Sequence, residues 1–392
     1  MSNNYKKMSL SYMLKNKLIK NKLNLHEPFF DEDEKKILNK SISLKNVSTA
    51  GNTTNIFEKK IAQLTNVKYA IATNSGTSAL HLALIACGIE KGDEVLMPSL
   101  NYIATANACL YLGAIPHFVD VEYDTLGIDV DRLLIYLNKI STVRKKVCFN
   151  KITKRKIKAI APLHIFGHPC KIDKIKTIAK KFKLFLIEDA AEGLGSYFKR
   201  KHVGTFGDMG VLSFNGNKII TTGAGGAILT NNKKLAKRIF SLSTINKINH
   251  KWKYEYNEIG YNYRMPSLNS SLGIAQIKKL QFFIKKKRKI FLIYKKIFKN
   301  QTLFKLFEEA KYCKSNYWLQ TIILNKNNKK IRDKFINLAH KQNLNIRPVW
   351  RPVHKSKHML RFPKMELKNT NDLENRIINL PSSPSVIKFL RN

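Results

Sequence analysis

Short apolar runs alternate with amphipathic stretches along this chain from about Phe57 to Asn232. The apolar runs are rich in β-branched residues and predict strands at residues 69–72, 95–97, 116–119, 159–163, 184–188, 209–214 and 226–229. The stretches between them have helical periodicity and predict helices at residues 78–87, 103–112, 129–140 and 172–182. This alternation is typical of an α/β fold, in which a mostly parallel central sheet carries helices on both faces.

The pattern changes near Tyr263. A long helical stretch covers residues 268–298, a strand-like run follows at 318–324, and prolines punctuate the segments 347–352 and 380–384. We therefore expect a smaller C-terminal α+β domain, because a chain of 392 residues can bury more than one compact core. The predicted division is an arm or leading helix, a large ligand-binding domain and the small domain, at residues 1–44, 45–262 and 263–392.

The charge balance invites a nucleic-acid interpretation, since 71 lysines and arginines stand against 27 acidic residues and give a formal net charge of +44. The lysines are spread along the chain, however. The one dense run, at 285–289, has apolar flanks that are typical of the solvated face of a long helix. We expect no nucleic-acid partner, because such a binder needs a recognition module and steeply salt-dependent affinity. A positive surface is compatible with the capture of an anionic substrate.

Cysteine usage and hydropathy indicate the compartment. The five cysteines form no C-x-x-C pair, so the sequence predicts neither a metal site nor a disulfide framework. The first thirty residues are polar and basic, and no segment approaches the ~18 to 20 apolar residues of a membrane span. We expect a cytoplasmic protein with no membrane partner.

Ligands of open α/β sheets bind beyond the carboxyl ends of the strands, so residues that follow strands are candidate site residues. The segment 74–80, Asn-Ser-Gly-Thr-Ser-Ala-Leu, lies between a predicted strand and a helix, where N–H groups and hydroxyls suit a phosphate. An ordinary helix N-cap explains the same segment when it is taken alone. Tyr102 also follows a strand; its ring suits a flat heteroaromatic ligand, and a core or surface tyrosine is the alternative.

A lysine and a carboxylate complete the candidate site. Lys218 lies after a predicted strand and before a glycine-rich turn, where backbone can approach a ligand closely. Asp189 follows another strand, within Ile187-Glu188-Asp189-Ala190-Ala191-Glu192. An amine for the aldehyde and a carboxylate for the pyridine nitrogen are the protein groups that pyridoxal phosphate requires. Taken singly, the lysine is explained as a solvated charge and the acid as a helix cap.

A series of segments in one order resembles the DegT/StrS family of pyridoxal phosphate-dependent nucleotide-sugar aminotransferases. The likeness extends from about Pro28 to Pro384, and its segments are residues 74–80, 92–95, 98–105, 113–116, 188–191, 207–208, 213–226 and 260–265. Segments 47–51, 215–223 and 347–350 most resemble the branch that serves bacillosamine-type and legionaminic acid synthesis. The resemblance implies fold type I of the pyridoxal phosphate-dependent transferases, as in aspartate aminotransferase, with the cofactor in the large domain.

The resemblance also implies roles for single residues. Lys218 matches the Schiff-base lysine, Asp189 the partner of the pyridine nitrogen and Tyr102 the ring stacked on the cofactor. Glu192 stands near the cofactor's phenolic oxygen, where glutamine is more usual, and Ala224 stands where the family often has Glu or Gly. The residues that match phosphate contacts are Thr77, Ser78 and Ser213.

Further roles concern the substrate and a second subunit. Asn262 matches an asparagine that reaches the cofactor phosphate of the neighbouring subunit, which implies a homodimer with shared active sites. Arg347 and His354 are the candidate substrate-binding residues of the late segment. A lone histidine in a loop is also explained without any function.

The function implied by the resemblance is transfer of an amino group from glutamate to the 4-keto position of a nucleotide-linked 4-keto-6-deoxy sugar. The branch resemblance favours a UDP-N-acetyl sugar, with a GDP-perosamine-type or dTDP-sugar aminotransferase as the alternative. A related dehydratase branch has histidine in place of the Schiff-base lysine, so Lys218 argues against it. A non-catalytic pyridoxal phosphate-binding regulator of the same fold is the alternative from another class.

Overall fold

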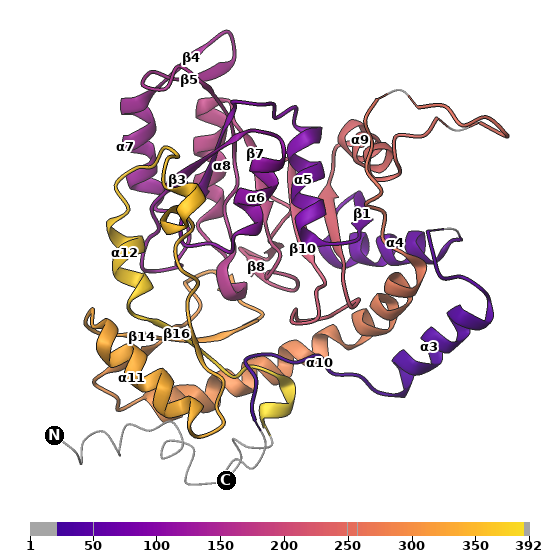
Figure 1. The fold of residues 1–392 in the computed structure, drawn as a ribbon. Coiled ribbons are helices and arrows are strands. Elements are labelled where there is room, and N and C mark those ends of the chain that lie inside the picture. Colours follow the sequence, from indigo (N-terminus) through magenta and orange to yellow (C-terminus); the bar gives the residue numbers. More distant parts are fainter. Residues whose placement is uncertain (1–21, 50, 249, 257, 388–392) are drawn as a thin grey trace.

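The computed structural model describes residues 22–387 except residues 50, 249 and 257 (Figure 1). Most of the predicted N-terminal arm, residues 1–21, lies outside the described residues, as do the last five residues of the predicted small domain.

A large mixed sheet forms the centre of the molecule (Figure 1). Its main path runs β1-β11-β10-β7-β6-β2-β3, and the strands are β1 (Tyr69–Thr73), β2 (Glu94–Pro98), β3 (Ile115–Val119), β6 (Lys156–Ile160), β7 (Phe185–Asp189), β10 (Met209–Ser213) and β11 (Gly226–Thr230). Neighbours from β10 to β3 pair in parallel, whereas β11 is antiparallel to both β1 and β10. The predicted α/β fold and its seven strands are confirmed.

Helices cover both faces of this sheet because its residues alternate between two cores. Ile71, Val211 and Ile228 face one core, and their neighbours Ala72 and Leu212 face the other. The first core includes residues of the four predicted helices, which are present as α5 (Gly76–Ala86), α6 (Ala104–Tyr111), α7 (Val130–Ile140) and α8 (Ile172–Phe182). The structure adds elements that were not predicted: α4 (Thr53–Thr65), α9 (Lys233–Ser243) and the hairpin of β4 (Ser141–Arg144) and β5 (Val147–Asn150).

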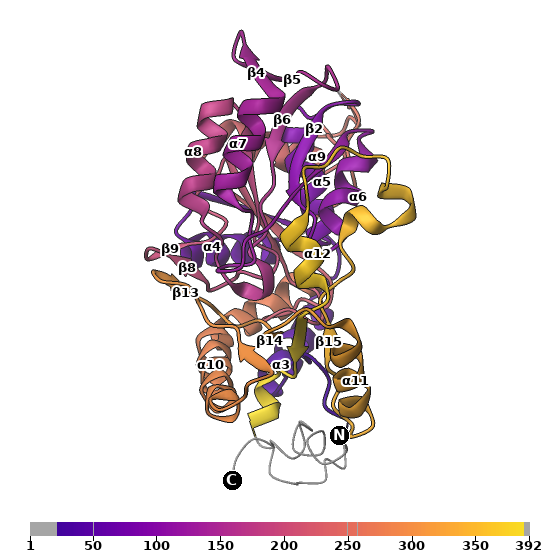
Figure 2. The ribbon, with the colours of Figure 1, turned by 90° about the vertical axis from the view of Figure 1, so that its left-hand side faces the viewer.

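A second, antiparallel sheet lies in the C-terminal part, in the order β12-β14-β16-β15. Its strands are β12 (Phe304–Leu306), β14 (Gln320–Leu324), β15 (Arg347–Pro348) and β16 (Ile377–Leu380). Figure 2 shows α10 (Ser267–Phe298) on one side of this sheet and α11 (Lys329–His340) on the other. This arrangement agrees with the predicted α+β character of the C-terminal part.

Two connections tie the second sheet to the first. A small sheet joins β8 (Tyr197–Phe198), β9 (Lys201–His202) and β13 (Cys313–Lys314) in the order β13-β8-β9. The chain before α12 (Lys368–Glu374) returns to the large core through Met359, Phe362 and Met365. Helix α10 packs both in the second core of the large sheet and in the core of the C-terminal sheet, so the boundary expected at residues 262/263 stays a prediction.

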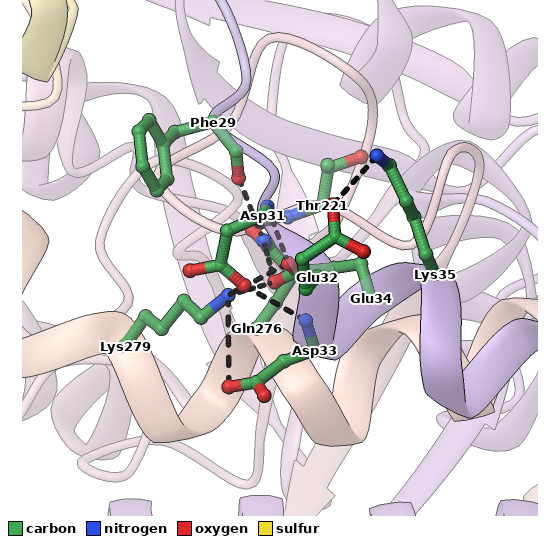
Figure 3. Close-up of polar contacts among 9 residues, drawn as sticks. All are labelled: Phe29, Asp31, Glu32, Asp33, Glu34, Lys35, Thr221, Gln276 and Lys279. Carbon is green, nitrogen blue, oxygen red and sulfur yellow. Dashed lines mark hydrogen bonds and ion pairs between the residues drawn. The ribbon is translucent and has the colours of Figure 1, made fainter.

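The N-terminal helix α3 (Glu32–Ser43) lies against α10, and Figure 3 shows how polar contacts hold it there. Asp31 and Glu34 form a capping box at its first turn. The buried carboxylate of Glu34 accepts hydrogen bonds from Lys279 at 2.6 Å and from Gln276 at 2.7 Å. The helix is therefore fixed by charge-assisted bonds as well as by packing.

Among the described residues, none of the helices combines the length and apolar character that crossing a lipid bilayer requires.

His202, on β9, is buried in a fixed tautomer. Its Nε2 accepts a hydrogen bond from the backbone N–H of Gly195 at 2.8 Å, and its Nδ1 donates to the carbonyl of Val203. A proton on Nε2 would face the Gly195 N–H group, and burial lowers the pKa of His202 to about 4.

Acid should therefore destabilise the fold through His202. Its pKa of about 4 lies below the ordinary value near 6.5, so the unfolded chain takes up the proton first as the pH falls. Between those two values the folded state should lose about 1.4 kcal/mol of stability per pH unit from this group. When unfolding by denaturant is measured at pH 7, 6 and 5, the free energy of unfolding of His202→Gln should fall less steeply with decreasing pH than that of the wild type. Parallel slopes would contradict this account.

Candidate active site

The predicted site residues gather at the carboxyl ends of β1, β2, β7 and β10. A cavity of about 340 Å³ lies there. The segments that follow these four strands line it together with two tryptophans from the C-terminal part, Trp318 and Trp350. Of the residues predicted from the sequence, the cavity is lined by Thr77, Tyr102, Asp189, Glu192, Ser213, Lys218 and Ala224.

Asp189, the last residue of β7, presents a buried carboxylate to this cavity. One oxygen accepts a hydrogen bond from the Thr105 hydroxyl at 2.6 Å, and the other accepts one from the Ala191 N–H at 3.2 Å. Asn101 in turn donates its amide to the Thr105 hydroxyl at 3.2 Å. Burial raises the pKa of Asp189, while the Thr105 bond opposes that rise. A cation placed opposite this carboxylate would keep it ionised.

The preceding residue, Glu188, holds the end of β7 in place. Its fully buried carboxylate accepts backbone N–H bonds from Gly204, Phe206 and Gly207 at 2.8, 2.6 and 2.7 Å. It also contacts Nε2 of His164 at 3.0 Å. Four partners on one carboxylate fix the backbone from which Asp189 projects.

Lys218 lies in the loop after β10, and side chains of α10 hold this loop through hydrogen bonds to its backbone. Gln276 accepts a hydrogen bond from the N–H of Thr221 and, through its amide, joins Glu34 of α3 (Figure 3). Asn269 donates to the carbonyls at both sides of Gly223. The loop that carries Lys218 is therefore anchored on the same helix as the N-terminal segment.

The amine of Lys218 has two close neighbours. Its Nζ lies 3.5 Å from Oε1 of Glu192 and 4.0 Å from the ring centroid of Trp318, a cation–π distance. Glu192 also accepts the N–H of Phe166 at 2.7 Å, and burial raises the pKa of Glu192 to about 7. This carboxyl changes its charge near neutral pH, beside the amine.

The start of α5 forms a small cradle at the cavity. Ser75 is the N-cap and accepts the N–H of Ser78 at 3.0 Å, while the Ser78 hydroxyl donates to Asn74 at 2.6 Å. A Cβ at Gly76 would lie 3.0 Å from Cβ of Ser213, so glycine lets the start of α5 pack closely against the end of β10. Thr77 and Ser213 line the cavity, whereas the side chain of Ser78 is engaged within the cap.

Three predicted residues lie away from this cavity. The imidazole of His354 is buried, and its Nδ1 is 2.6 Å from the Ser99 hydroxyl, so the structure does not bring it to the predicted sugar pocket. Asn262 is exposed, and its carbonyl accepts the side-chain amide of Asn74 at 3.4 Å. Arg347 lines an adjoining cavity.

Sequence reasoning missed several residues of the site. Thr105 and Asn101 lie in the segment after β2 that was already singled out, so their position signalled them. Trp318 and Trp350 come from more than 90 residues beyond Lys218; the segments 318–324 and 347–350 that contain them were singled out from the sequence, but their place beside Lys218 was not predicted. Tyr102 is 55% exposed, and its ring meets that of Trp350 edge to face at 5.9 Å.

The residues fit pyridoxal phosphate on observations of their own. An amine and a buried carboxylate line the same cavity, and the N-terminus of α5, which also lines it at Gly76 and Thr77, suits a phosphate. The side-chain oxygen of Asn101 is buried and lacks a partner among the described residues, which leaves an acceptor for a bound group. An amine, a buried carboxylate and a phosphate-binding helix N-terminus in one cavity are the groups that characterise a pyridoxal phosphate-dependent enzyme.

The chain belongs to the DegT/DnrJ/EryC1/StrS aminotransferase family, which it matches over residues 28–388. Members of this family are sugar aminotransferases that depend on pyridoxal phosphate, so this chain is an enzyme of that class. The family predicted from the sequence is thereby confirmed.

Similar proteins act on different nucleotide sugars. The GDP-perosamine synthase of Escherichia coli O157:H7 is 38% identical over 366 residues, which cover 92% of this chain and 93% of that protein. The UDP-4-amino-4,6-dideoxy-N-acetyl-beta-L-altrosamine transaminase of Campylobacter jejuni is 37% identical over 279 residues, 71% of this chain and 70% of that protein. Helicobacter pylori PseC, an aminotransferase of pseudoaminic acid biosynthesis, superposes with a TM-score of 0.84 at 26% identity, covering 94% of this chain and 97% of that one.

Replacing Glu192 by Gln should remove a titration from the activity. The wild-type carboxyl, with a pKa of about 7, is neutral at pH 6 and charged at pH 8 beside Lys218. The kcat/KM of the wild-type enzyme, plotted against pH, should change slope near pH 7, with up to about a tenfold change per pH unit on one side. The Gln variant should lose this change of slope. The exposed Glu32→Gln variant is the control and should keep it. Identical profiles for wild type and Glu192→Gln would refute the assignment.

Proposed function

We propose that this enzyme transfers an amino group from glutamate to the 4-keto carbon of a GDP-linked 4-keto-6-deoxy sugar, in the manner of a perosamine synthase. The observation that carries the proposal is the single cavity that Lys218 and the buried Asp189 share. The GDP sugar is supported by the similarity to a GDP-perosamine synthase over nearly the whole of both chains.

The UDP-N-acetyl sugar that the sequence favoured has weaker support. The similar UDP-sugar transaminase matches over 71% of this chain, whereas the similar GDP-perosamine synthase matches over 92%. The GDP-linked alternative therefore replaces it as the preferred substrate. In either case the substrate is a nucleotide-linked keto sugar and the partner substrate is an amino donor.

When bound, pyridoxal phosphate supplies an electron sink and an amino-group carrier. Nζ of Lys218 would hold the cofactor through its aldehyde, and the same amine would take the proton from the α-carbon of glutamate. The same nitrogen later delivers a proton to C4 of the sugar. Asp189 would hold positive charge on the pyridine nitrogen. Burial raises the pKa of its carboxyl, whereas the hydrogen bonds from Thr105 and Ala191 and a cation opposite it favour the ionised form.

The remaining site residues position the cofactor. We assign its phosphate to the cradle of Gly76, Thr77 and Ser213, and one ring face to Tyr102. Glu192, whose Oε1 is 3.5 Å from Nζ of Lys218, would lie near the cofactor's phenolic oxygen, and its carboxyl, with a pKa of about 7, would hold or release a proton there near neutral pH.

A second copy of the chain is part of this proposal. Asn262 is exposed at the rim of the Asn74 loop, outside the cavity of its own chain. We therefore keep the prediction that it reaches the cofactor phosphate of a neighbouring subunit in a homodimer.

Amination assays with a panel of nucleotide sugars test the proposed substrate. Purified holoenzyme with glutamate should convert a GDP-linked 4-keto-6-deoxy sugar, with kcat/KM at least about tenfold above the UDP-N-acetyl and dTDP compounds, a difference of about 1.4 kcal/mol in transition-state binding. Preference for the UDP compound would restore the first expectation. Binding of the cofactor without turnover of any keto sugar would favour the non-catalytic regulator.

Lys218→Ala should reduce turnover by about 10³-fold or more, because the amine serves both as cofactor anchor and as proton carrier. The exposed Lys237→Ala variant is the matched control and should turn over like the wild type. Circular dichroism should show both variants folded. Appreciable multiple-turnover amination by Lys218→Ala would contradict the role of this lysine.

A further inference from the structure

The indole ring of Trp318 lies against the amine of Lys218. Nζ of Lys218 is 4.0 Å from the centroid of this ring, and the same nitrogen is 3.5 Å from Oε1 of Glu192. An ammonium group at such a distance is attracted by the negative face of an indole. Trp318 lines both the active-site cavity and the adjoining one, so its side chain forms part of the wall between them.

The ring is oriented by its own hydrogen bond. Nε1–H of Trp318 donates to the carbonyl of Asn217 at 2.7 Å, and Asn217 directly precedes Lys218 in the chain. Trp318 is 3% exposed, so a rotation of the ring would leave this buried donor without its partner. The indole and the backbone that carries the lysine therefore keep a fixed relation.

The side-chain amide of Asn316 joins the two neighbours of the lysine amine. Its oxygen accepts the N–H of Trp318 at 2.7 Å, and its nitrogen donates to the carbonyls of Glu192 and Leu194, both at 2.8 Å. A Cβ at position 167 would collide with this oxygen, so Gly167 is required beside it. One fully buried amide thus fixes the backbone of Trp318 relative to that of Glu192.

The backbone directly before Trp318 is strained. Tyr317 has a φ of 50°, in the left-handed region that bulky residues rarely adopt. Its ring stacks on that of Phe291 in α10 with centroids 4.3 Å apart, and its N–H donates to the Ser315 hydroxyl at 2.9 Å. Strain that the surroundings enforce in this way is characteristic of functional sites, where it provides a required geometry.

The carbonyl of Trp318 is held from α10 and from the turn at Ser382. It accepts hydrogen bonds from Nζ of the fully buried Lys287 at 2.9 Å and from the Ser382 hydroxyl at 2.8 Å. The backbone N–H, the carbonyl and the indole N–H of Trp318 are therefore all bonded inside the protein. A side chain fixed at each of its polar groups keeps one position.

We propose that Trp318 is a positioning residue of the reaction, whose indole face holds the amine of Lys218 in the cavity while that amine carries a proton. The inference rests on the proposed function, in which the amine takes a proton from one carbon and gives it to another. Between these steps it is an ammonium group on a long, flexible stem. The cation–π contact keeps it beside the reacting carbons, because the stem is otherwise free to turn into the adjoining cavity.

Three changes at position 318 separate the electrostatics of the ring from its shape. Trp318→Phe keeps a smaller aromatic face, and Trp318→Met keeps an apolar side chain without one. Tetrafluorotryptophan incorporated at this position keeps the size and the N–H group but removes most of the negative charge from the ring face. Trp350→Met is the matched control, because Trp350 lines the same cavity while its ring contacts those of Tyr102 and Phe166.

Two measurements report on the amine. In the full-length chain without cofactor, trace acylation followed by peptide mass mapping gives the reactivity of Lys218, with the exposed Lys237 as internal reference. In the holoenzyme, rapid mixing with L-glutamate gives the saturated rate and the apparent Kd of the first half-reaction.

The acylation rate of Lys218 relative to Lys237 should rise about threefold or more in Trp318→Met and in the fluorinated protein, and less in Trp318→Phe. A weaker cation–π contact leaves the amine more often free to react. The saturated rate with glutamate should fall about threefold or more in the same order, with the apparent Kd of glutamate within about twofold of the wild type. Trp350→Met should leave the acylation rate of Lys218 within about twofold.

Unchanged reactivity of Lys218 in Trp318→Met and in the fluorinated protein would overturn the proposal. Equal effects of Trp318→Met and Trp350→Met would overturn it too, because they would reflect only the opening of the cavity. A higher reactivity without a lower saturated rate, or a change confined to the Kd of glutamate, would contradict the positioning role.

The fluorinated protein decides the question if Trp318→Met does not fold, since fluorination leaves the size of the ring nearly unchanged. Failure of the proposed function is distinguishable from failure of this inference. Acylation of Lys218 requires neither cofactor nor substrate, so it reports on Trp318 even in an enzyme that aminates no keto sugar.

Discussion

The buried carboxylate of Glu188 is the contact on which the geometry of the active site depends. It accepts hydrogen bonds from three backbone N–H groups of the loop before β10 and contacts the ring of His164, so these groups surround the end of β7. Because β7 and β10 pair in parallel, with Val211 beside Asp189, the segments that leave them emerge side by side. The amine of Lys218 and the carboxylate of Asp189 therefore meet in one cavity as a consequence of sheet topology.

The second support of the site comes from α10, which links distant parts of the chain. Gln276 joins the loop after Lys218 to Glu34 of α3, and Lys287 joins the backbone of Trp318 to the turn at Ser382. One helix thus holds the Lys218 loop, the N-terminal segment and the tryptophan that covers the amine. The active site is built by the large sheet and closed by the C-terminal part.

Local pattern predicted the sheet and most of its helices, because buried strands and amphipathic helices differ in period over a few residues. The β4–β5 hairpin escaped prediction since Lys145 and Lys146 occupy its turn with positive φ, where Asn-Gly is the usual signal. Ser75, three residues before Ser78, is the actual cap of α5. His354 and the two tryptophans depend on contacts between residues far apart in sequence, which no local pattern encodes.

The most direct test of this account is to locate the cofactor on the chain. Holoenzyme reduced with borohydride and digested for peptide mass mapping should carry the pyridoxyl label on the peptide that contains Lys218, in proportion to the bound cofactor. A label on a different lysine, or an unlabelled Lys218 peptide from enzyme that aminates its substrate, would contradict the central claim.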